Sequence, residues 1–300
     1  RSGGATLMLS FVTNFRGDLP QTGMLAAELM RAGEDSADPQ LTSWGYQIRG
    51  YAELALGPLD EAVAHLREGT ALAARIPAWD NFLYQVSLLA KCLVLQGKFD
   101  AAVTLLGKTT HVIEVEKFHL PFDVVEVMTA FATCSLAVAE HQAASPHSEA
   151  MREARRACET AVTCARVIPG WLPEALRLRG NLDWLCGKPH AALRWWRESL
   201  VVAEKSAFPI ERARTLLEMG HRTGDVAQVA QASEIFRQTG ARVFLAHALH
   251  CQAQLHERSS PDALSAMPYY ARAITALEEV NANHALERAR SQHARLQGKS

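Results

Sequence analysis

The sequence has little net charge and few cysteines. Its 31 Lys and Arg residues nearly balance 32 Asp and Glu, so the formal net charge is −1 and no overall basic field attracts nucleic acid or an anionic membrane. The six cysteines are scattered, without a C-x-x-C pair or a dense framework, which is typical of small buried side chains in a reducing compartment. We therefore expect neither a nucleic-acid partner nor disulfide bonds.

Long apolar runs and a signal peptide are also missing. No apolar run approaches the roughly 18 residues that a membrane span requires, and no basic and apolar leader opens the chain. The chain begins Arg-Ser-Gly-Gly, without a methionine, and enters an apolar segment almost at once. We interpret it as a cytoplasmic piece of a longer polypeptide, with no membrane partner.

Motifs that carry catalysis or hold a cofactor do not occur. There is no Gly-x-Ser-x-Gly and no Gly-rich dinucleotide loop, and Gly298-Lys299-Ser300 lacks the first glycine of a phosphate-binding loop. One predicted helix carries several possible metal ligands, but helical spacing supplies only two of the usual four: His247, His250, Cys251 and His256. We predict no catalytic residue, no metal and no cofactor, and hence no enzyme activity in this chain.

Helix-forming residues dominate what is present. Hydrophobic residues make up 48% of the chain, and the β-branched and aromatic runs typical of strands are missing. One pattern is written twice, as Gly57-Pro58-Leu59-Asp60-Glu61-Ala62 and Gly97-Lys98-Phe99-Asp100-Ala101-Ala102. Corresponding residues lie forty apart (97 − 57 = 40), and Gly17 lies another forty upstream. A fixed period of this size predicts an array of stacked helical hairpins.

The turn glycines divide the chain into these hairpins. A glycine just past a helix end readily adopts the left-handed conformation, and a proline after it suits the start of the next helix. The polar tract from Ala32 to Pro39 is predicted to connect the first two hairpins. We predict an all-α, right-handed α-solenoid forming a single domain over residues 1–300, with seven hairpins at about 5–31, 41–76, 79–117, 122–168, 172–206, 210–239 and 243–280, and a capping helix at 283–297.

The repeats resemble the tetratricopeptide repeat family. Residues of its pattern stand at Tyr46, Gly50, Gly57, Ala62, Leu66 and Gly69, although Arg49 replaces the usual Leu and the period exceeds the usual ~34. Three sequence motifs are similar to the C-terminal repeat arrays of bacterial multidomain signalling proteins: Phe15-Arg16-Gly17-Asp18, Gly224-Asp225 and residues 235–242. Such arrays accompany ATPase modules, class III adenylate or guanylate cyclases and transcriptional regulators, so the resemblance implies a regulatory context.

The same resemblance implies which side chains face a concave groove. In tetratricopeptide arrays the first helix of each hairpin lines that surface. Counting from the small crossing residues gives the candidate binding residues Trp44, Gln47, Tyr51, Tyr84, Ser87, Lys91, Glu126, Thr129, Glu174, Arg177, Asn181, Trp184, Glu211 and Arg214, with Thr133 and Glu218 beside them. Aromatic anchors among amide and charged groups suit a peptide or partner helix. Packing between helices is the equal alternative for Trp44, Tyr51 and Trp184.

Three functional interpretations follow. The first is a non-catalytic interaction or sensory domain that binds a peptide, a protein partner or its own parent chain in the groove. A monomer and a homodimer are both open alternatives for such a domain. The second is a regulatory domain that holds a small-molecule effector in a pocket lined by Trp and Arg. The third is a fragment of a nucleotide cyclase or ATPase whose catalytic parts lie outside this chain.

Overall fold

The computed structural model describes residues 3–76, 79–116, 121–260 and 263–298. In these ranges all regular structure is helical. It consists of fifteen α-helices and two short 3-10 helices, η1 (Pro169–Trp171) and η2 (Ala263–Ala266). The helices are α1 (Gly3–Phe15), α2 (Leu19–Ser36), α3 (Pro39–Leu56), α4 (Leu59–Ala73), α5 (Trp79–Leu95), α6 (Phe99–Glu116), α7 (Pro121–His141), α8 (Glu149–Ala165), α9 (Leu172–Leu185), α10 (Pro189–Lys205), α11 (Pro209–Thr223), α12 (Val226–Thr239), α13 (Arg242–Ser259), α14 (Met267–Glu279) and α15 (Asn283–Gln297).

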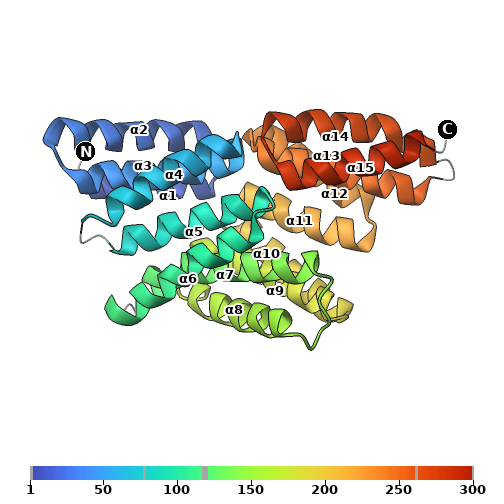
Figure 1. Ribbon diagram of the computed structural model, residues 1–300, viewed down its shortest axis with the longest axis horizontal. Coiled ribbons are helices and arrows are strands. Elements are labelled where there is room, and N and C mark those ends of the chain that lie inside the picture. The colour runs from blue at the N-terminus through green and yellow to red at the C-terminus, as the bar shows by residue number, and fades with distance from the viewer. Residues whose placement is uncertain (1–2, 77–78, 117–120, 261–262, 299–300) are drawn as a thin grey trace.

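Consecutive helices pack side by side as hairpins, from α1/α2 to α13/α14, with α15 against α14 (Figure 1). The predicted all-α hairpin architecture is confirmed. One connection differs: α2 continues through most of the tract at 32–39 and ends at Ser36, where Ala37 adopts a left-handed φ of 52°. The extension is possible because Gly33 has no side chain, and a Cβ there would lie 2.3 Å from Thr42 Oγ1 on α3.

The turn glycines have the positive φ angle that the repeat pattern predicts, although Gly57, with a ψ of 178°, lies outside the left-handed helical region. Positive φ angles between 66° and 80° occur at Gly17, Gly57, Gly97, Gly187 and Gly224. The fourth hairpin, whose turn has no glycine, uses Ala143 at φ 47° instead. Each of these residues ends the first helix of its hairpin and reverses the chain.

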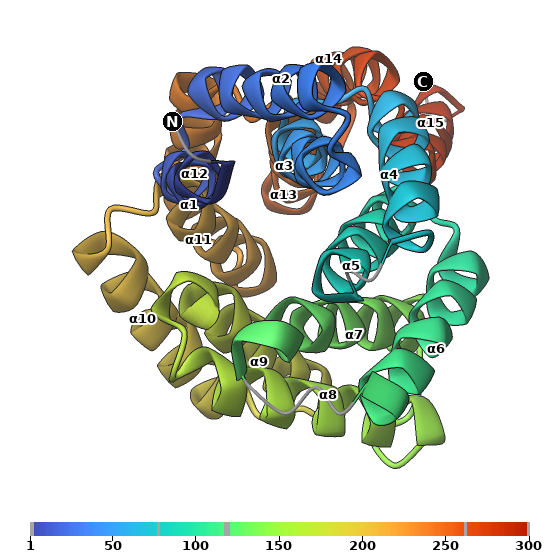
Figure 2. The ribbon, with the colours of Figure 1, turned by 90° about the vertical axis from the view of Figure 1, so that its left-hand side faces the viewer.

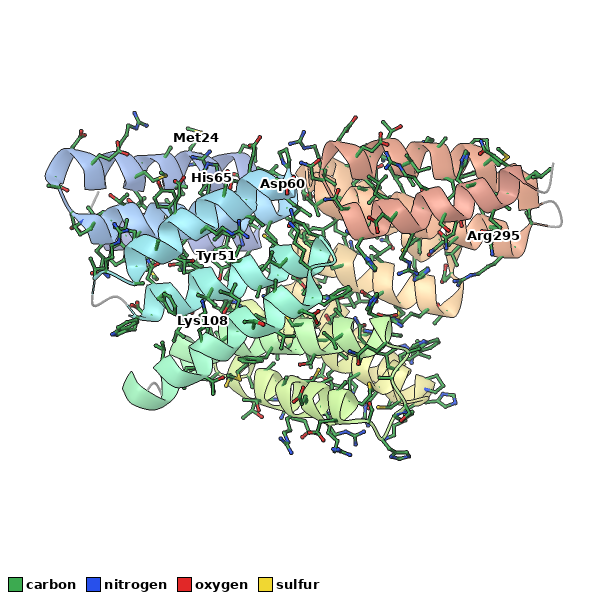
Figure 3. All side chains as sticks on the ribbon, in the orientation of Figure 1. Met24, Tyr51, Asp60, His65, Lys108 and Arg295 are labelled. Atoms are coloured by element: carbon green, nitrogen blue, oxygen red, sulfur yellow. The ribbon has the colours of Figure 1, made fainter. Side chains whose placement is uncertain are left out.

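The hairpins form a ring (Figure 2). The odd-numbered helices contact one another in sequence from α1 to α13, while α2, α4, α6, α8 and α10 lie outside them. Side chains on this outer layer, such as Met24 on α2 and Lys108 on α6, are exposed (Figure 3). The ring closes because α13 packs on α3 and α15 packs on α5, which brings the last hairpin against the second and third.

We call this closing contact the seam, and it is formed by Leu56–Asp60 against Arg242–Val243 and Val280–Asn281. The N–H of Leu59 donates to the carbonyl of Val280 at 3.0 Å, and Arg242 Nε donates to the carbonyl of Leu56 at 3.0 Å. Leu59 and Val280 are both buried and belong to one apolar cluster that extends through most of the array. The seam is therefore continuous with the hydrophobic core.

Helix α7 is more apolar than expected. Its segment Val124–His141 has a mean hydropathy of 1.3 over 18 residues, which is long and apolar enough to cross a membrane. The expectation that no such run occurs is therefore wrong. Half of that segment is buried, however, and α7 packs against α5, α6, α8 and α9, so its position inside the array accounts for its composition.

Candidate functional site

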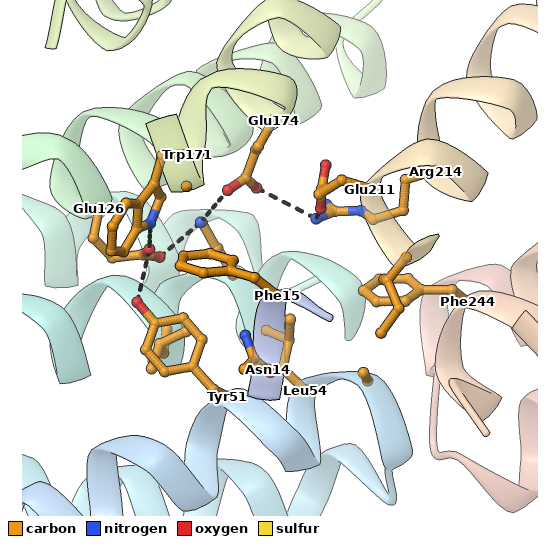
Figure 4. Close-up of a pocket in the computed structure, with 15 residues that line it drawn as sticks. Asn14, Phe15, Tyr51, Leu54, Glu126, Trp171, Glu174, Glu211, Arg214 and Phe244 are labelled. Carbon is orange, nitrogen blue, oxygen red and sulfur yellow. Dashed lines mark hydrogen bonds and ion pairs between the residues drawn. The ribbon is translucent and has the colours of Figure 1, made fainter. Parts of the chain in front are cut away.

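Charged side chains from four inner helices converge inside the ring (Figure 4). Lys91 Nζ on α5 lies 2.7 Å from Glu126 Oε1 on α7 and 3.0 Å from Glu174 Oε2 on α9. The same ammonium donates to Thr129 Oγ1 at 3.1 Å. The side chains of Lys91, Glu126 and Glu174 are each less than a tenth exposed, so these pairs are formed away from water.

The network continues onto α11. Arg177 Nε lies 3.3 Å from Glu211 Oε2, and Arg214 Nη1 lies 3.4 Å from Glu174 Oε1. Arg214 also pairs with Glu211 and lies over the ring of Phe244, with its Cζ 4.8 Å from the ring centre. We call the six charged residues the interior network, which contains as many cations as carboxylates: Lys91, Glu126, Glu174, Arg177, Glu211 and Arg214.

Mutual attraction keeps the buried groups ionised. Burial by itself would raise the pKa of Glu174, but Lys91, Arg214 and Arg177 outweigh it and lower that pKa to about 2. Burial would likewise lower the pKa of Lys91, whereas Glu126 and Glu174 raise it above its ordinary value. Both groups are therefore charged at neutral pH.

Aromatic side chains form the wall beside the network. Tyr51 Oη donates to Glu126 Oε2 at 2.9 Å, and Trp171 Nε1 donates to the same oxygen. The Phe15 and Trp171 ring centres are 5.0 Å apart, and Phe11 contacts the rings of Tyr51, Tyr84 and Trp171. Burial, followed by the charge of Glu126, raises the pKa of Tyr51, so its hydroxyl stays a donor.

A small cavity lies between the network and this wall. It has a volume of about 70 Å³, and its lining includes Tyr51, Lys91, Glu174 and Arg214 together with Phe15 (Figure 4). We call it the first cavity. It is too small for a peptide, because pairs among the chain's own side chains fill most of the interior of the ring.

The structure brings together most of the predicted groove residues. The inner cluster contains Tyr51, Tyr84, Lys91, Glu126, Thr129, Glu174, Arg177, Glu211 and Arg214. Each comes from the first helix of its hairpin, as the register predicts, and the fourth hairpin keeps this register despite its different turn.

The other predicted residues have local roles. Trp184 packs on Trp196 with ring centres 5.7 Å apart, and Asn181 Oδ1 accepts from Trp196 Nε1 at 3.0 Å. The hydroxyl of Ser87 donates to the carbonyl of Leu83 within its own helix. Gln47 is buried, and Trp44 is partly buried near the start of α1. Thr133 is partly buried, and its hydroxyl has no hydrogen-bond partner. Glu218 pairs with Arg222 at 3.2 Å.

Several residues at the site are not among the predicted groove residues. Phe11 and Phe15 come from α1, and Trp171 comes from η1. Their approach depends on Gly170, where a Cβ would lie 2.7 Å from Phe15 Cε2. The only sequence signal is the Pro169-Gly170-Trp171 turn, because a glycine beside an aromatic residue permits close packing.

The fold and its charged interior define a tetratricopeptide-like helical repeat protein. No known protein family and no curated protein sequence matches the chain. One similar solved structure is a Rap protein complexed with competence and sporulation factor, with a TM-score of 0.56 and 10% sequence identity; the match covers 99% of this chain and 98% of that chain. Another is NprR with its cognate peptide NprX, with a TM-score of 0.56 and 13% sequence identity; the match covers 96% of this chain and 82% of that chain. At these identities the similarity establishes the fold alone.

A third similar structure is a signal transduction ATPase with numerous domains and a tetratricopeptide repeat sensor, from Pyrococcus horikoshii. It has a TM-score of 0.49 and 14% identity, and the match covers 92% of this chain but 44% of that longer one.

Proposed function

We propose that this chain is a non-catalytic regulatory domain that recognises a peptide, or an extended segment of a partner or of its own parent chain, inside its ring. The observation that carries the proposal is the convergence of four buried charged side chains, two partly buried ones and an aromatic wall on the inner helices. The Rap protein complexed with competence and sporulation factor and NprR with its cognate peptide share the fold, which supports peptide or factor recognition by this chain.

The interior network is poorly explained by stability. Removing charges from water costs free energy that their attraction only partly offsets, and apolar side chains of similar volume often stabilise a core as well or better. A pairing of three cations with three carboxylates does, however, preserve groups that a ligand's own charges can engage. The aromatic side chains beside them supply the rigid apolar surface that binding sites use.

Peptide binding requires the ring to open. The first cavity, at about 70 Å³, has no room for a chain of several residues. We propose that a peptide exchanges its charges for those of the interior network and that the hairpins separate around it, as in hinge-type transitions between two packed states. In this view the internal pairs hold the ligand-free ring closed.

The test is selection from a displayed library of random peptides against the intact chain. The wild type is expected to enrich related sequences. Glu211→Gln leaves Arg177 and Arg214 less neutralised and is expected to shift selection towards acidic peptides, whereas Glu198→Gln on the exposed face of α10 leaves selection unchanged. Failure to enrich any sequence, or identical selection by both variants, contradicts the proposal.

A small-molecule effector is the second candidate. It is favoured by two interior cavities, one of about 70 Å³ and another of about 190 Å³, that accept a compact ligand without opening the ring. A ligand selective for the folded state raises the melting temperature by mass action. A metabolite screen by thermal shift distinguishes this function from peptide capture.

The parent context is a separate proposal. Four further proposals rest on the sequence resemblance and composition alone. They are an ATPase or cyclase upstream, a cytoplasmic location, a homodimer, and the lack of catalysis in this chain. None of the three similar structures named above is described as a nucleotide cyclase. Sequencing the gene upstream of Arg1, and incubation of the chain with ATP or GTP and a divalent metal, test these points.

A further inference from the structure

A second cavity lies beyond Arg214 and Phe244, which line it as well as the first cavity. It has a volume of about 190 Å³ and is formed by α9, α11 and α13 with the end of α5. Its lining consists of Leu95, Arg177, Arg214, Leu217, Glu218, His221, Phe244, His247 and Cys251.

Two buried polar atoms in this lining have no hydrogen-bond partner. They are Arg177 Nη2 and His247 Nε2. Arg177 is only 3% exposed, its Nε faces Glu211, and its Nη2 lies 3.5 Å from Glu174 Oε1 without a hydrogen bond. Buried polar atoms normally find partners, so two unsatisfied nitrogens on residues that line one cavity indicate that a hydrogen-bond acceptor belongs there, with His247 in the tautomer that carries its proton on Nε2.

The remaining lining selects the kind of acceptor. Leu95, Leu217 and Phe244 provide an apolar wall. The one carboxylate, Glu218, is already paired with Arg222 at 3.2 Å, so it repels an incoming anion less than a free carboxylate would. A cavity whose lining combines unsatisfied nitrogens with aliphatic and aromatic carbon suits an anionic head on an apolar body.

We propose that the second cavity binds a carboxylate carried on a compact apolar group, with its two oxygens accepting hydrogen bonds from Arg177 Nη2 and His247 Nε2. Two sources have this chemistry: the C-terminal residue of a peptide, and a free aliphatic or aromatic acid. The peptide source rests on the proposed function, whereas the free acid does not.

Binding of a carboxylate here depends on pH. The titratable and charged groups around His247 are His250 on its own helix, Arg177 on α9, Arg214, Glu218 and His221 on α11, and His284 and Arg288 on α15. Burial, then His250, lowers the pKa of His247 to about 4, so the empty cavity holds a neutral imidazole at pH 7. A bound carboxylate raises that pKa, so the carboxylate form binds more tightly as pH falls, down to the range in which the acid group of the ligand is itself protonated.

The experiment titrates the intact chain with benzoate and isovalerate, and with benzamide and isovaleramide, which have the same shapes without the charge. Binding is followed through the imidazole resonances of histidine-labelled protein. A second arm compares library-selected peptides ending in Leu or Phe as free acids and as C-terminal amides. The proposal predicts that acids bind and shift the His247 signal, whereas amides bind at least roughly tenfold more weakly because one hydrogen-bonded charge is lost.

Two variants test the donors. Arg177→Lys keeps a positive charge for Glu211 but removes Nη2, and His247→Asn keeps a donor but cannot titrate. The first is expected to weaken acid binding about tenfold, and the second to remove its pH dependence. Arg197→Gln, exposed on α10, is the matched control and changes neither.

The outcomes separate the two proposals. Binding of the small acids alone assigns the site to a free acid, and preference for free-acid peptides assigns it to a peptide C-terminus. If neither small acids nor peptide acids are preferred over their amides, or if Arg177→Lys binds as the wild type does, the carboxylate site is wrong. In that case a library-selected peptide still supports the proposed function. Conversely, preferred binding of the acids without any selected peptide supports the carboxylate site alone.

Discussion

The N–H of Leu59 donates a hydrogen bond to the carbonyl of Val280, 3.0 Å away, and thereby joins the second hairpin to the last. Beside it, Asn281 Nδ2 donates to Asp60 Oδ2 at 3.0 Å. Because backbone groups and buried apolar side chains both take part, ring closure is built into the fold. The interior network lies within the ring that this seam completes.

The seam predicts unequal effects of valine at two turn glycines. Both Gly57 and Gly187 have positive φ, and Gly57 also has a ψ of 178°, so valine strains the backbone at either site by roughly 1–3 kcal/mol. Only at Gly57 is there a neighbour, because a Cβ would lie 3.1 Å from Val280 Cβ, while nothing lies within 4 Å at Gly187. We expect Gly57→Val to lose roughly 1–3 kcal/mol more in urea unfolding. Equal losses would show that the seam is not closely packed.

Removal of Lys91 should expose the cost of the buried carboxylates. Lys91→Met leaves Glu126 and Glu174 with fewer compensating charges, and we expect a loss of roughly 3–5 kcal/mol in the free energy of unfolding. Adding Glu126→Gln should recover part of this loss, since the two residues are coupled. Lys108→Met, on the exposed face of α6, is the control and should unfold like the wild type. Additive losses in the double variant would argue against the pair.

Two buried histidines should make the fold sensitive to mild acid. Burial is the largest cause that lowers the pKa values of His247 and His250 from 6.5 to about 4, so the unfolded chain binds more protons between these values. Stability is therefore full above about pH 6.5 and decreases as pH falls to about 4. His250→Gln should flatten this part of the stability curve measured by urea unfolding. An unchanged slope would mean that His250 is not buried in its neutral form.

Glu174 should act in a lower pH range. Its pKa is lowered from 4.5 to about 2, since Lys91 and the arginines outweigh burial, so its stabilisation is present above about pH 4.5 and is lost as pH falls towards 2. Glu174→Gln should remove this dependence while leaving the slope between pH 6.5 and 4.5 in place. Acid unfolding followed by circular dichroism tests the separation of the two ranges.

Much of this architecture was predictable because repeats describe local geometry. The turn at Gly57 and the inward direction of Glu126 follow from helix period and turn chemistry, which act over a few residues. The seam does not, since the contact of Gly57 with Val280 depends on small angles between hairpins that accumulate around the ring. Trp171 was missed for a related reason, because it lies in a 3-10 turn outside the helical register.

The ion pairs within the site could not be predicted from the sequence either. The sequence places Lys91, Glu174 and Arg214 on inner faces, but a groove residue can face solvent or a partner across the ring. The structure shows the second arrangement, with ligand-like contacts among the chain's own side chains. Only the radius of the ring decides between these arrangements, and no local pattern encodes that radius.

The central claim is that the interior of the ring is the recognition surface. The most direct measurement takes a library-selected peptide that carries a benzophenone group, cross-links it to the intact chain by light, and maps the adducts by mass spectrometry. We predict adducts on the inner helices α5, α7, α9 and α11, competed by the unmodified peptide. Competed adducts confined to the outer helices α6, α8 and α10 would contradict the claim.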